Sequence, residues 1–324
     1  MGNEGSSSIV DRRLDLAWQM LATLGAPASA EPIATTPVDP ECAILLGGMC
    51  ATDDPRIGEA TQWLLKSVHR SLSVSRMKAL AAQLGDRATA GTAYIGATAT
   101  GVPSLRQWER SFASEPGTRS ATDVANKDRL SSRIGADEVT TATLAQPGAF
   151  RLRMRMSFGV GARTEALSAL LVRRNAATSP ELEWLSVPQL EHATGFGKRH
   201  LLDQLPDMAR AGLLDHTRDG RTHRFRARAE FLAAMEPIPA RWVDWTSYIA
   251  TLLELEDAMR ILEANPTTAG AMDASRRISD HPDVVPVRFA PLGSPETLPD
   301  RLRDWLLTNA RHVAAIDSHA ANRR

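Results

Sequence analysis

Apolar side chains recur at helical spacing along most of the chain, which predicts a mostly helical protein. Residues 1–8 are polar and are expected to be loose. The apolar stripe from Ile9 to Leu24 stops at Gly25 and predicts an amphipathic helix. Residues 26–39 are rich in Pro and Ala and are interpreted as a connector. Three further helices are expected, at residues 40–51, 55–69 and 73–84. Together these helices form a multi-helical N-terminal unit, which has no fixed-period repeat.

The helical pattern weakens between Gly85 and Gly148, where Gly, Ser, Thr and Ala dominate. One short helix is expected there, at residues 103–112, and the rest is interpreted as a long irregular connection. Apolar residues then alternate with arginines over residues 150–158, and this period of two favours a strand. A helix start is the alternative, because Met and Arg are good helix formers. A helix is expected next, at residues 159–175.

The most specific pattern in the chain lies in residues 186–226. Ser186 and Gln189 have the spacing of a capping box, which begins a short helix. Gly195 follows where the chain must turn sharply, and we expect a positive φ there. A second helix is expected to begin near Lys198, with one apolar face made of Leu201, Leu205 and Met208.

Gly212 suits the position after this second helix and is expected to end it. Residues 213–218 and 222–226 then have the character of two short strands. They flank Asp219-Gly220, a dipeptide typical of two-residue hairpin turns. A short helix, a glycine turn, a second helix and a basic hairpin in this order predict a winged helix-turn-helix, a module most often used to bind duplex DNA.

The candidate nucleic-acid-binding residues belong to the second helix and the hairpin: Lys198, Arg199, His200, Arg210, Arg218, Arg221, Arg224 and Arg226. The start of the second helix usually enters the major groove, while a basic hairpin suits phosphate contacts. Asp203 and Asp207 weigh against this interpretation, because they place negative charge on the same face. Pro206 is expected to kink the helix or to remove a hydrogen bond from it. The alternative is a winged helix that serves assembly or binds a protein partner.

Two apolar helices are expected after the hairpin, at residues 241–263 and 299–316. Trp242 and Trp245 belong to the first, and they fill either a local core or the interface of a homodimer. The Pro-rich segment between the helices is expected to be extended, with a short strand at residues 284–289. The predicted domains are therefore helical (1–112), irregular (113–149), winged helix-turn-helix (150–237) and helical (238–324).

Charge is distributed unevenly, although the net charge of the 324 residues is zero. Residues 151–229 hold 14 lysines and arginines against 8 acidic residues, a net charge of +6. Residues 1–150 hold 14 against 16, and residues 230–324 hold 10 against 14. The basic excess coincides with the predicted winged helix, as expected for a nucleic-acid-binding segment.

The sequence offers little that suits catalysis. It contains no G-x-G-x-x-G, no phosphate-binding G-x4-G-K-[ST] and no G-x-S-x-G motif, so neither an enzyme nor a cofactor is expected. Cys42 and Cys50 are interpreted as core thiols, and the histidines do not have metal-ligand spacing. Asp53-Asp54 precedes a helix that starts with Pro and is interpreted as its cap. Apolar runs are too short to span a bilayer, so a cytoplasmic protein is expected.

Several segments also resemble a bacterial family of winged-helix proteins with an ArsR/MarR-like helix-turn-helix. The resemblance is carried by residues 16–26, 54–64, 74–85 and 152–171, the helix-turn-helix itself and the Trp242/Trp245 helix, and it departs at residues 85–148. It implies a transcriptional regulator or an antitoxin-like partner. Similar proteins accompany nucleotidyltransferase-type toxins, so the resemblance also implies a neighbour-encoded toxin of this type as a partner.

Overall fold

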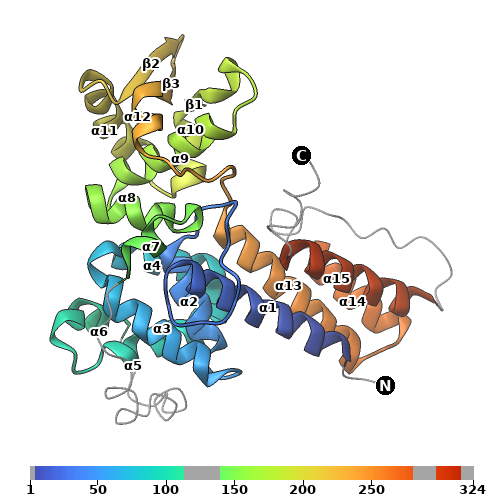
Figure 1. Ribbon diagram of the computed structural model, residues 1–324. Helices are drawn as coiled ribbons and strands as arrows, with labels where there is room; N and C mark the ends of the chain where they lie inside the picture. Colours follow the sequence, from blue (N-terminus) through green and yellow to red (C-terminus); the bar gives the residue numbers. More distant parts are fainter. Residues whose placement is uncertain (1–3, 113–138, 280–296, 315–324) are drawn as a thin grey trace. The chain divides into compact units, whose positions relative to one another are not determined.

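The computed structural model describes residues 4–112, 139–279 and 297–314 (Figure 1). The described chain is mostly helical and has one small antiparallel sheet, as the sequence predicts for the fold class. It divides into two compact units. The smaller unit combines Met1–Trp18 with Trp245–Arg324, and the larger unit is Gln19–Asp244. No helix in the described ranges is both long enough and apolar enough to cross a membrane.

The first half of the larger unit is a set of helices around α2, every residue of which is buried. Asp39 caps α2, and its Oδ1 accepts from the backbone N–H groups of Glu41 and Cys42 at 3.1 and 3.3 Å. Asp54 caps α3 in the same way, as its position before a proline predicts. The helices are α2 (Pro40–Cys50), α3 (Pro55–Val68), α4 (Val74–Leu84), α5 (Thr89–Ala99) and α6 (Arg106–Phe112), with 3-10 turns η1 (His69–Ser71), η2 (Gly85–Ala88) and η3 (Pro103–Leu105).

Helix α5 corrects the expectation of an irregular connection over residues 85–148. Its Gly and Thr residues are weak helix formers, but the small Gly and Ala residues let α5 lie directly against α2. A Cβ at Gly48 would stand 3.0 Å from the carbonyl oxygen of Gly91, and one at Gly91 would stand 2.7 Å from that of Leu45. The close approach of the two helix backbones therefore requires small residues in α5. The same small residues give this segment the composition of a loop. After residues 113–138, which lie outside the described ranges, come α7 (Thr141–Leu144) and η4 (Pro147–Ala149).

Residues 150–158 form a helix, α8 (Phe150–Phe158), and the expected strand is wrong. Arg151 and Arg155 lie four residues apart, on one face of α8, and both are buried. The alternation of apolar and basic residues does not separate an inner from an outer face, because both kinds of residue are buried: Phe150, Arg151, Leu152, Met154 and Arg155. Buried arginines thus give a helix the sequence pattern of a strand.

The second half of the larger unit contains the three-stranded sheet and the helices that pack against it. The helices are α9 (Ala162–Ala176), α10 (Val187–Thr194) and α11 (Lys198–Arg210), and the strands are β1 (Leu185–Ser186), β2 (Leu214–Asp219) and β3 (Thr222–Ala227), with η5 (Pro180–Glu183) before β1. The sheet is antiparallel in the order β1-β3-β2. The core between this sheet and the helices is formed mainly by Phe150, Leu167, Leu170, Leu171, Leu190, Leu201, Leu205, Leu214 and Phe225.

The local signals in this region are confirmed, with one shift. The capping box of Ser186 and Gln189 is present, and Gly195 and Gly212 have φ values of 72° and 78°. Asp219 pairs with Thr222, so the two-residue turn is Gly220-Arg221 rather than Asp219-Gly220. Gly220 takes the positive φ, 57°, at the first position of the turn, where a glycine is favoured in one of the common hairpin turns.

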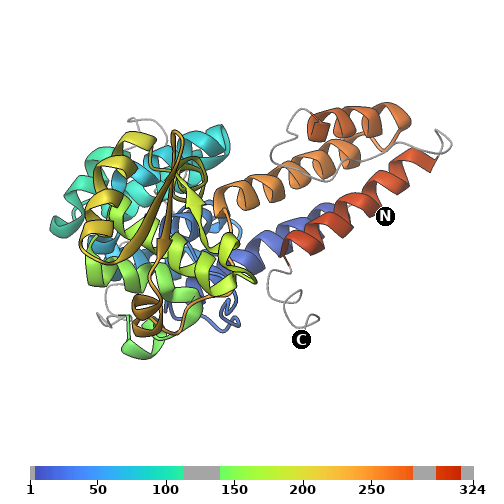
Figure 2. The same cartoon turned by 90° about the horizontal axis from the view of Figure 1, so that it is seen from above.

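The smaller unit is a set of long helices (Figures 1 and 2). They are the start of α1 (Glu4–Thr23), α13 (Trp245–Ala264), α14 (Thr268–Ser279) and α15 (Leu298–Ala314); α12 (Ala229–Ala234) belongs to the larger unit. Arg13 on α1 and Glu256 on α13 form a salt bridge of 3.0 Å, and Arg277 on α14 bonds Glu254 at the same distance. The expected strand at residues 284–289 lies outside the described ranges.

Two helix starts and one whole helix in this unit differ from expectation. Helix α1 begins at Glu4, within the segment expected to be loose, and α13 begins at Trp245 rather than at residue 241. Helix α14 was not anticipated. The apolar face of α13 packs inside the chain, with Trp245 only 1% exposed. The homodimer stays a prediction, but this face no longer provides a surface for it.

Candidate functional site

The amino-terminal end of α11 presents basic side chains to solvent. Lys198, Arg199 and His200 are all exposed in the first turn, while Leu201 points into the core. The Lys198 backbone N–H donates to the Glu191 carboxylate on α10, which fixes the start of the helix. The exposed N-terminal end of α11 therefore carries three of the predicted site residues on neighbouring positions.

The β2–β3 hairpin carries another group of the predicted residues. Arg221 is exposed in the turn, and Arg218 is exposed beside it, with its Nε donating to the Gly220 carbonyl at 2.9 Å. Arg224 is also exposed, but it lies on β3 opposite Thr217 and beside Ser186. Because side chains alternate along a strand, Arg224 is on the face of the sheet opposite the buried Phe225.

Arg226 is held by the fold. Its side chain is 25% exposed and forms salt bridges with Asp215 at 2.8 Å and Glu183 at 3.1 Å. Its guanidinium also lies 4.7 Å from the centre of the Trp184 ring. Partial burial raises the pKa of Asp215. The hydrogen bonds from Arg226 and Arg228 lower this pKa by a larger amount, so the net shift is downward. These contacts make Arg226 a structural residue.

Acidic residues lie close to the predicted basic surface. Asp203, Asp207 and Asp219 are exposed, and Asp207 forms a salt bridge with Arg210. Arg210 therefore has a partner on its own helix. Pro206 lies inside α11, yet the helix continues to Arg210. The positive charge of α11 is thus concentrated at its start.

Two histidines lie side by side on the hairpin. His216 Nε2 and His223 Nδ1 are 3.0 Å apart, and His216 also stacks on Phe225 with ring centres 4.6 Å apart. Burial, His223 and Arg218 lower the pKa of His216. The described residues contain no group of three or more side chains suited to a metal ion.

A cluster of six charged side chains, which we call the charge network, lies among the helices of the larger unit; five are buried, and Arg76 is half-buried. It consists of Asp39, Glu41, Arg76, Arg151, Arg155 and Glu165. Arg151 bonds Asp39 at 2.8 Å and Glu165 at 2.5 Å. Arg155 bonds Glu41 at 2.6 Å and Glu165 at 2.5 Å. Three arginines balance three carboxylates, so the network joins α2, α4, α8 and α9 without a net charge.

The surrounding charges set the protonation of these carboxylates. Burial raises the pKa of Asp39, but Arg151, Arg76 and Arg155 together bring it well below its ordinary value. Burial likewise opposes the ionisation of Glu165, yet Arg151 and Arg155 lower its pKa to about 2. For Glu41 burial outweighs the attraction of Arg155, and its pKa is raised. Asp39 and Glu165 are thus the carboxylates of the network that remain ionised to the lowest pH.

The charge network reaches the turn between α10 and α11. Arg76 bonds Asp39 at 2.5 Å and donates its other terminal nitrogen to the carbonyl of Thr194, the last residue of α10. Trp242 donates to the neighbouring carbonyl of Ala193 at 3.2 Å, and Arg151 lies 4.9 Å from the centre of the Trp242 ring. Trp242 therefore contacts both Arg151 of the charge network and the end of α10.

Sequence reasoning missed the charge network. The partners are far apart in the chain, with Arg155 following Glu41 by 114 residues. The one local signal was the pair Arg151 and Arg155 at helical spacing in an apolar segment. These two arginines belong to the basic excess of residues 151–229, but they are neutralised inside the protein and add nothing to its surface.

Comparison with known proteins gives no relative. Neither a protein-family model, nor a curated protein, nor a solved structure matches the chain.

Proposed function

We propose that the chain is a DNA-binding transcriptional regulator and that residues 150–237 act as its winged helix-turn-helix. The observation that carries this proposal is the placement of exposed basic side chains. Lys198 and Arg199 lie at the start of α11, and Arg221 lies at the tip of the adjoining hairpin. Helix α11 contacts β2, so the helix and the hairpin are neighbours in the fold (Figure 1).

The two groups of residues have different tasks in this proposal. A helix N-terminal end fits the major groove, where an arginine recognises guanine through two parallel hydrogen bonds. Arg199 takes that task. A hairpin beside the groove meets the sugar-phosphate backbone, where a cation contributes affinity without sequence preference. Arg221 and Arg218 take that task. Arg210 and Arg226 are omitted because both have salt-bridge partners within the protein.

The test is fluorescence anisotropy with labelled duplex DNA at low salt. The triple variant Lys198→Glu, Arg199→Glu and Arg221→Glu reverses the three exposed charges and should bind random duplex much more weakly than the wild type. Arg106→Glu is the matched control, since Arg106 is an exposed arginine on α6 in the same unit. If the wild-type protein binds neither random duplex nor the DNA upstream of its own gene, the proposal is wrong.

A second function is favoured by an apolar patch. Met156, Phe158 and Val160, at the junction of α8 and α9, are 50, 51 and 37% exposed. Phe158 contacts Phe231 edge-on, with ring centres 6.2 Å apart. Several exposed large apolar side chains in one short segment are typical of protein-binding surfaces. They support an antitoxin-like role, in which a neighbour-encoded toxin covers the patch.

The experiment for this second function is co-expression with the product of the adjacent gene. Met156→Ser with Phe158→Ser should abolish co-purification and leave duplex binding intact. Met272→Ser, at an exposed methionine of the smaller unit, is the control. If the double variant still co-purifies with its partner, the patch is not the interface.

A further inference from the structure

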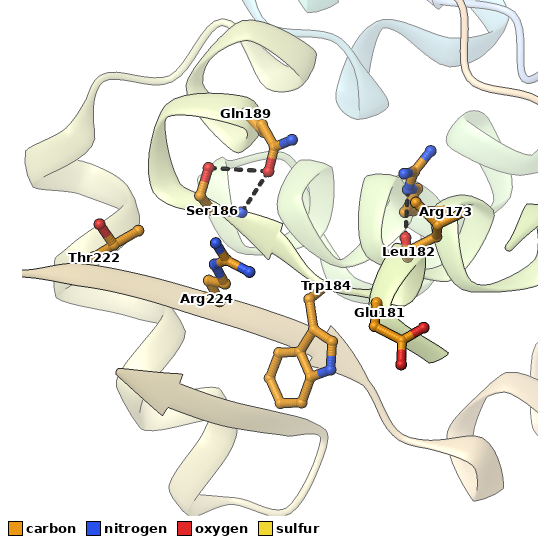
Figure 3. A pocket seen from close by; sticks show the side chains of 8 residues that line it. All are labelled: Arg173, Glu181, Leu182, Trp184, Ser186, Gln189, Thr222 and Arg224. Atoms are coloured by element: carbon orange, nitrogen blue, oxygen red, sulfur yellow. Dashed lines mark hydrogen bonds between the residues drawn. The ribbon is translucent and has the colours of Figure 1, made fainter. Parts of the chain in front are cut away.

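The outer face of the sheet has a hollow of about 410 Å³ (Figure 3). Its residues come from α9, η5, β1, α10 and β3, so separate elements of the fold build it. Arg224 and Ser186 face each other across β3 and β1 on the side of the sheet opposite Phe225. Volumes of a few hundred Å³ are typical of sites for small organic ligands.

An indole and two guanidiniums dominate the lining. Trp184 is half-buried, and Arg226 lies 4.7 Å from its ring centre, which holds the ring in place. Arg173 donates from Nε to the carbonyl of Leu182 at 2.6 Å, which fixes its guanidinium at the rim (Figure 3). Arg224 extends from β3 between Ser186 and Trp184. The hollow therefore combines an aromatic surface with two cations, of which Arg173 is held by its hydrogen bond to Leu182.

The polar groups add hydrogen-bonding capacity. The backbone N–H and the hydroxyl of Ser186 both donate to the Gln189 Oε1, at 2.8 and 2.9 Å. The Gln189 side-chain oxygen is thereby used, and its amide nitrogen is the part that can donate to a ligand. Thr222, at the start of β3, contributes a hydroxyl, and Glu181 contributes the one carboxylate of the lining.

These groups are the ones that a nucleotide needs. A nucleobase stacks on an aromatic ring, a phosphate takes bidentate hydrogen bonds from guanidinium, and base edges and sugar hydroxyls bond to amides and hydroxyls. A hydrocarbon ligand would leave the two arginines unused, and a simple anion would leave the indole unused. The lining thus favours a ligand with a flat aromatic part and a negatively charged part.

We propose that this hollow binds a nucleotide, with the base on Trp184 and the phosphate on Arg224. The nucleotide is either a free mononucleotide or an unpaired nucleotide at the end of a nucleic-acid strand, since both present the same base and phosphate. The site is separate from the exposed residues of α11, because it lies on the outer face of the sheet. It therefore goes beyond the proposed duplex binding.

Calorimetry on the full chain tests the first source, with adenosine and thymidine monophosphates as probes and inorganic phosphate for comparison. Trp184→Leu and Arg224→Gln should each weaken nucleotide binding about tenfold or more, which is the order of one base stack or one charged contact. Trp184→Phe should retain most of it, because the stacking surface remains. Arg106→Gln is the exposed-arginine control and should change nothing.

Anisotropy tests the second source, using blunt duplex and the same duplex with a short single-stranded overhang. A preference for the overhang that disappears in Trp184→Leu supports the hollow as a site for an unpaired nucleotide. Nucleotide binding in calorimetry that depends on Trp184 supports a free ligand. If Trp184→Leu does not fold, Trp184→Phe and Arg224→Gln provide the comparison.

Two results would overturn the proposal. One is the absence of any Trp184- or Arg224-dependent binding at millimolar mononucleotide together with equal affinity for blunt and overhang duplexes. The other is phosphate binding as tight as mononucleotide binding, which would leave no role for the indole. Neither result bears on blunt-duplex binding through Lys198, Arg199 and Arg221, so the two proposals fail separately.

Discussion

The guanidinium of Arg76 on α4 donates a hydrogen bond to the carbonyl of Thr194, the residue that ends α10. Gly195 follows and turns the chain with a φ of 72°, and α11 begins three residues later. Through Asp39, the same guanidinium belongs to the charge network. The position of α11 is therefore tied to the helical first half of the larger unit, and Arg76 is a positioning residue for the proposed recognition helix.

Replacing Arg76 should loosen this turn. Arg76→Ala leaves the buried Asp39 with one fewer cation and frees the Thr194 carbonyl, and breaking a buried ion pair costs about 3–5 kcal/mol. We expect urea unfolding to report a loss of that order. Compared with the wild type, hydrogen exchange in Arg76→Ala should be faster at the amides of residues 190–197, whereas exchange in α3 should change less. Arg70→Ala, at an exposed arginine of the same unit, should stay within about 0.5 kcal/mol of the wild type. Unchanged exchange in the turn would show that Arg76 does not hold it.

Glu165 is one of the two carboxylates of the charge network whose pKa is lowered. It bonds both Arg151 and Arg155 at 2.5 Å and is buried. Glu165→Gln leaves two buried guanidiniums with a neutral partner and should cost about 3 kcal/mol in unfolding free energy. Glu230→Gln, at an exposed glutamate, is the control. A loss below about 1 kcal/mol would mean that the network contributes little to stability, as is found for some buried ion pairs.

Stability should also fall in acid because of this network. The pKa of Glu165 is about 2 in the folded chain against an ordinary value of 4.5, so its contribution is complete above the unfolded pKa. It is lost as the pH falls from about 5 towards 2, and it amounts to roughly 3 kcal/mol at 1.4 kcal/mol per pKa unit. Asp39 acts in the same direction, and Glu41, whose pKa is raised, acts in the opposite one. Urea midpoints measured across this range should have a shallower pH dependence in Glu165→Gln than in the wild type.

The sequence could predict those parts of the candidate site that depend on local signals. The Ser186 capping box, the Gly195 turn and the hairpin each require a few neighbouring residues of particular chemistry, and such signals survive in a single sequence. The charge network could not be predicted. Its pairing of Glu41 with Arg155 is set by how α2 and α8 pack, and nothing in either segment specifies the other. The sequence pattern places Asp39 in a connector, although it caps α2 and neutralises Arg151.

The same limit explains the errors in the fold. In α8 the arginines are buried because carboxylates from α2 and α9 meet them, so burial does not follow hydrophobicity. In α5 glycine and alanine are favoured by backbone contact with α2 rather than by a turn. Trp242 was expected to lie in a helix, but it lies before α13 and uses its indole N–H to hold the end of α10. Tertiary contacts override local propensity at all three places.

Arg199 should determine specificity rather than affinity in general. It is exposed in the first turn of α11, where a bidentate contact with a guanine is geometrically accessible. Arg199→Ala should cost about 1–3 kcal/mol on the cognate site and much less on random duplex. Competition anisotropy with a selected site and a scrambled one measures the difference. Equal losses on the two DNAs would make Arg199 a phosphate contact.

Arg221 and Arg226 provide a matched pair on one hairpin, in which exposure decides the outcome. Arg221 is exposed at the turn, so Arg221→Gln should weaken binding on all duplexes alike, reduce the salt slope by about 1, and leave stability unchanged. Arg226 bonds Asp215 and Glu183, so Arg226→Gln should cost about 1 kcal/mol or more in unfolding free energy with little direct effect on the salt slope. Anisotropy at several salt concentrations and urea unfolding give both quantities for each variant. If instead Arg226→Gln keeps full stability and reduces the salt slope, its salt bridges open on binding, and the basic surface of the hairpin extends further along β3 than its exposed residues indicate.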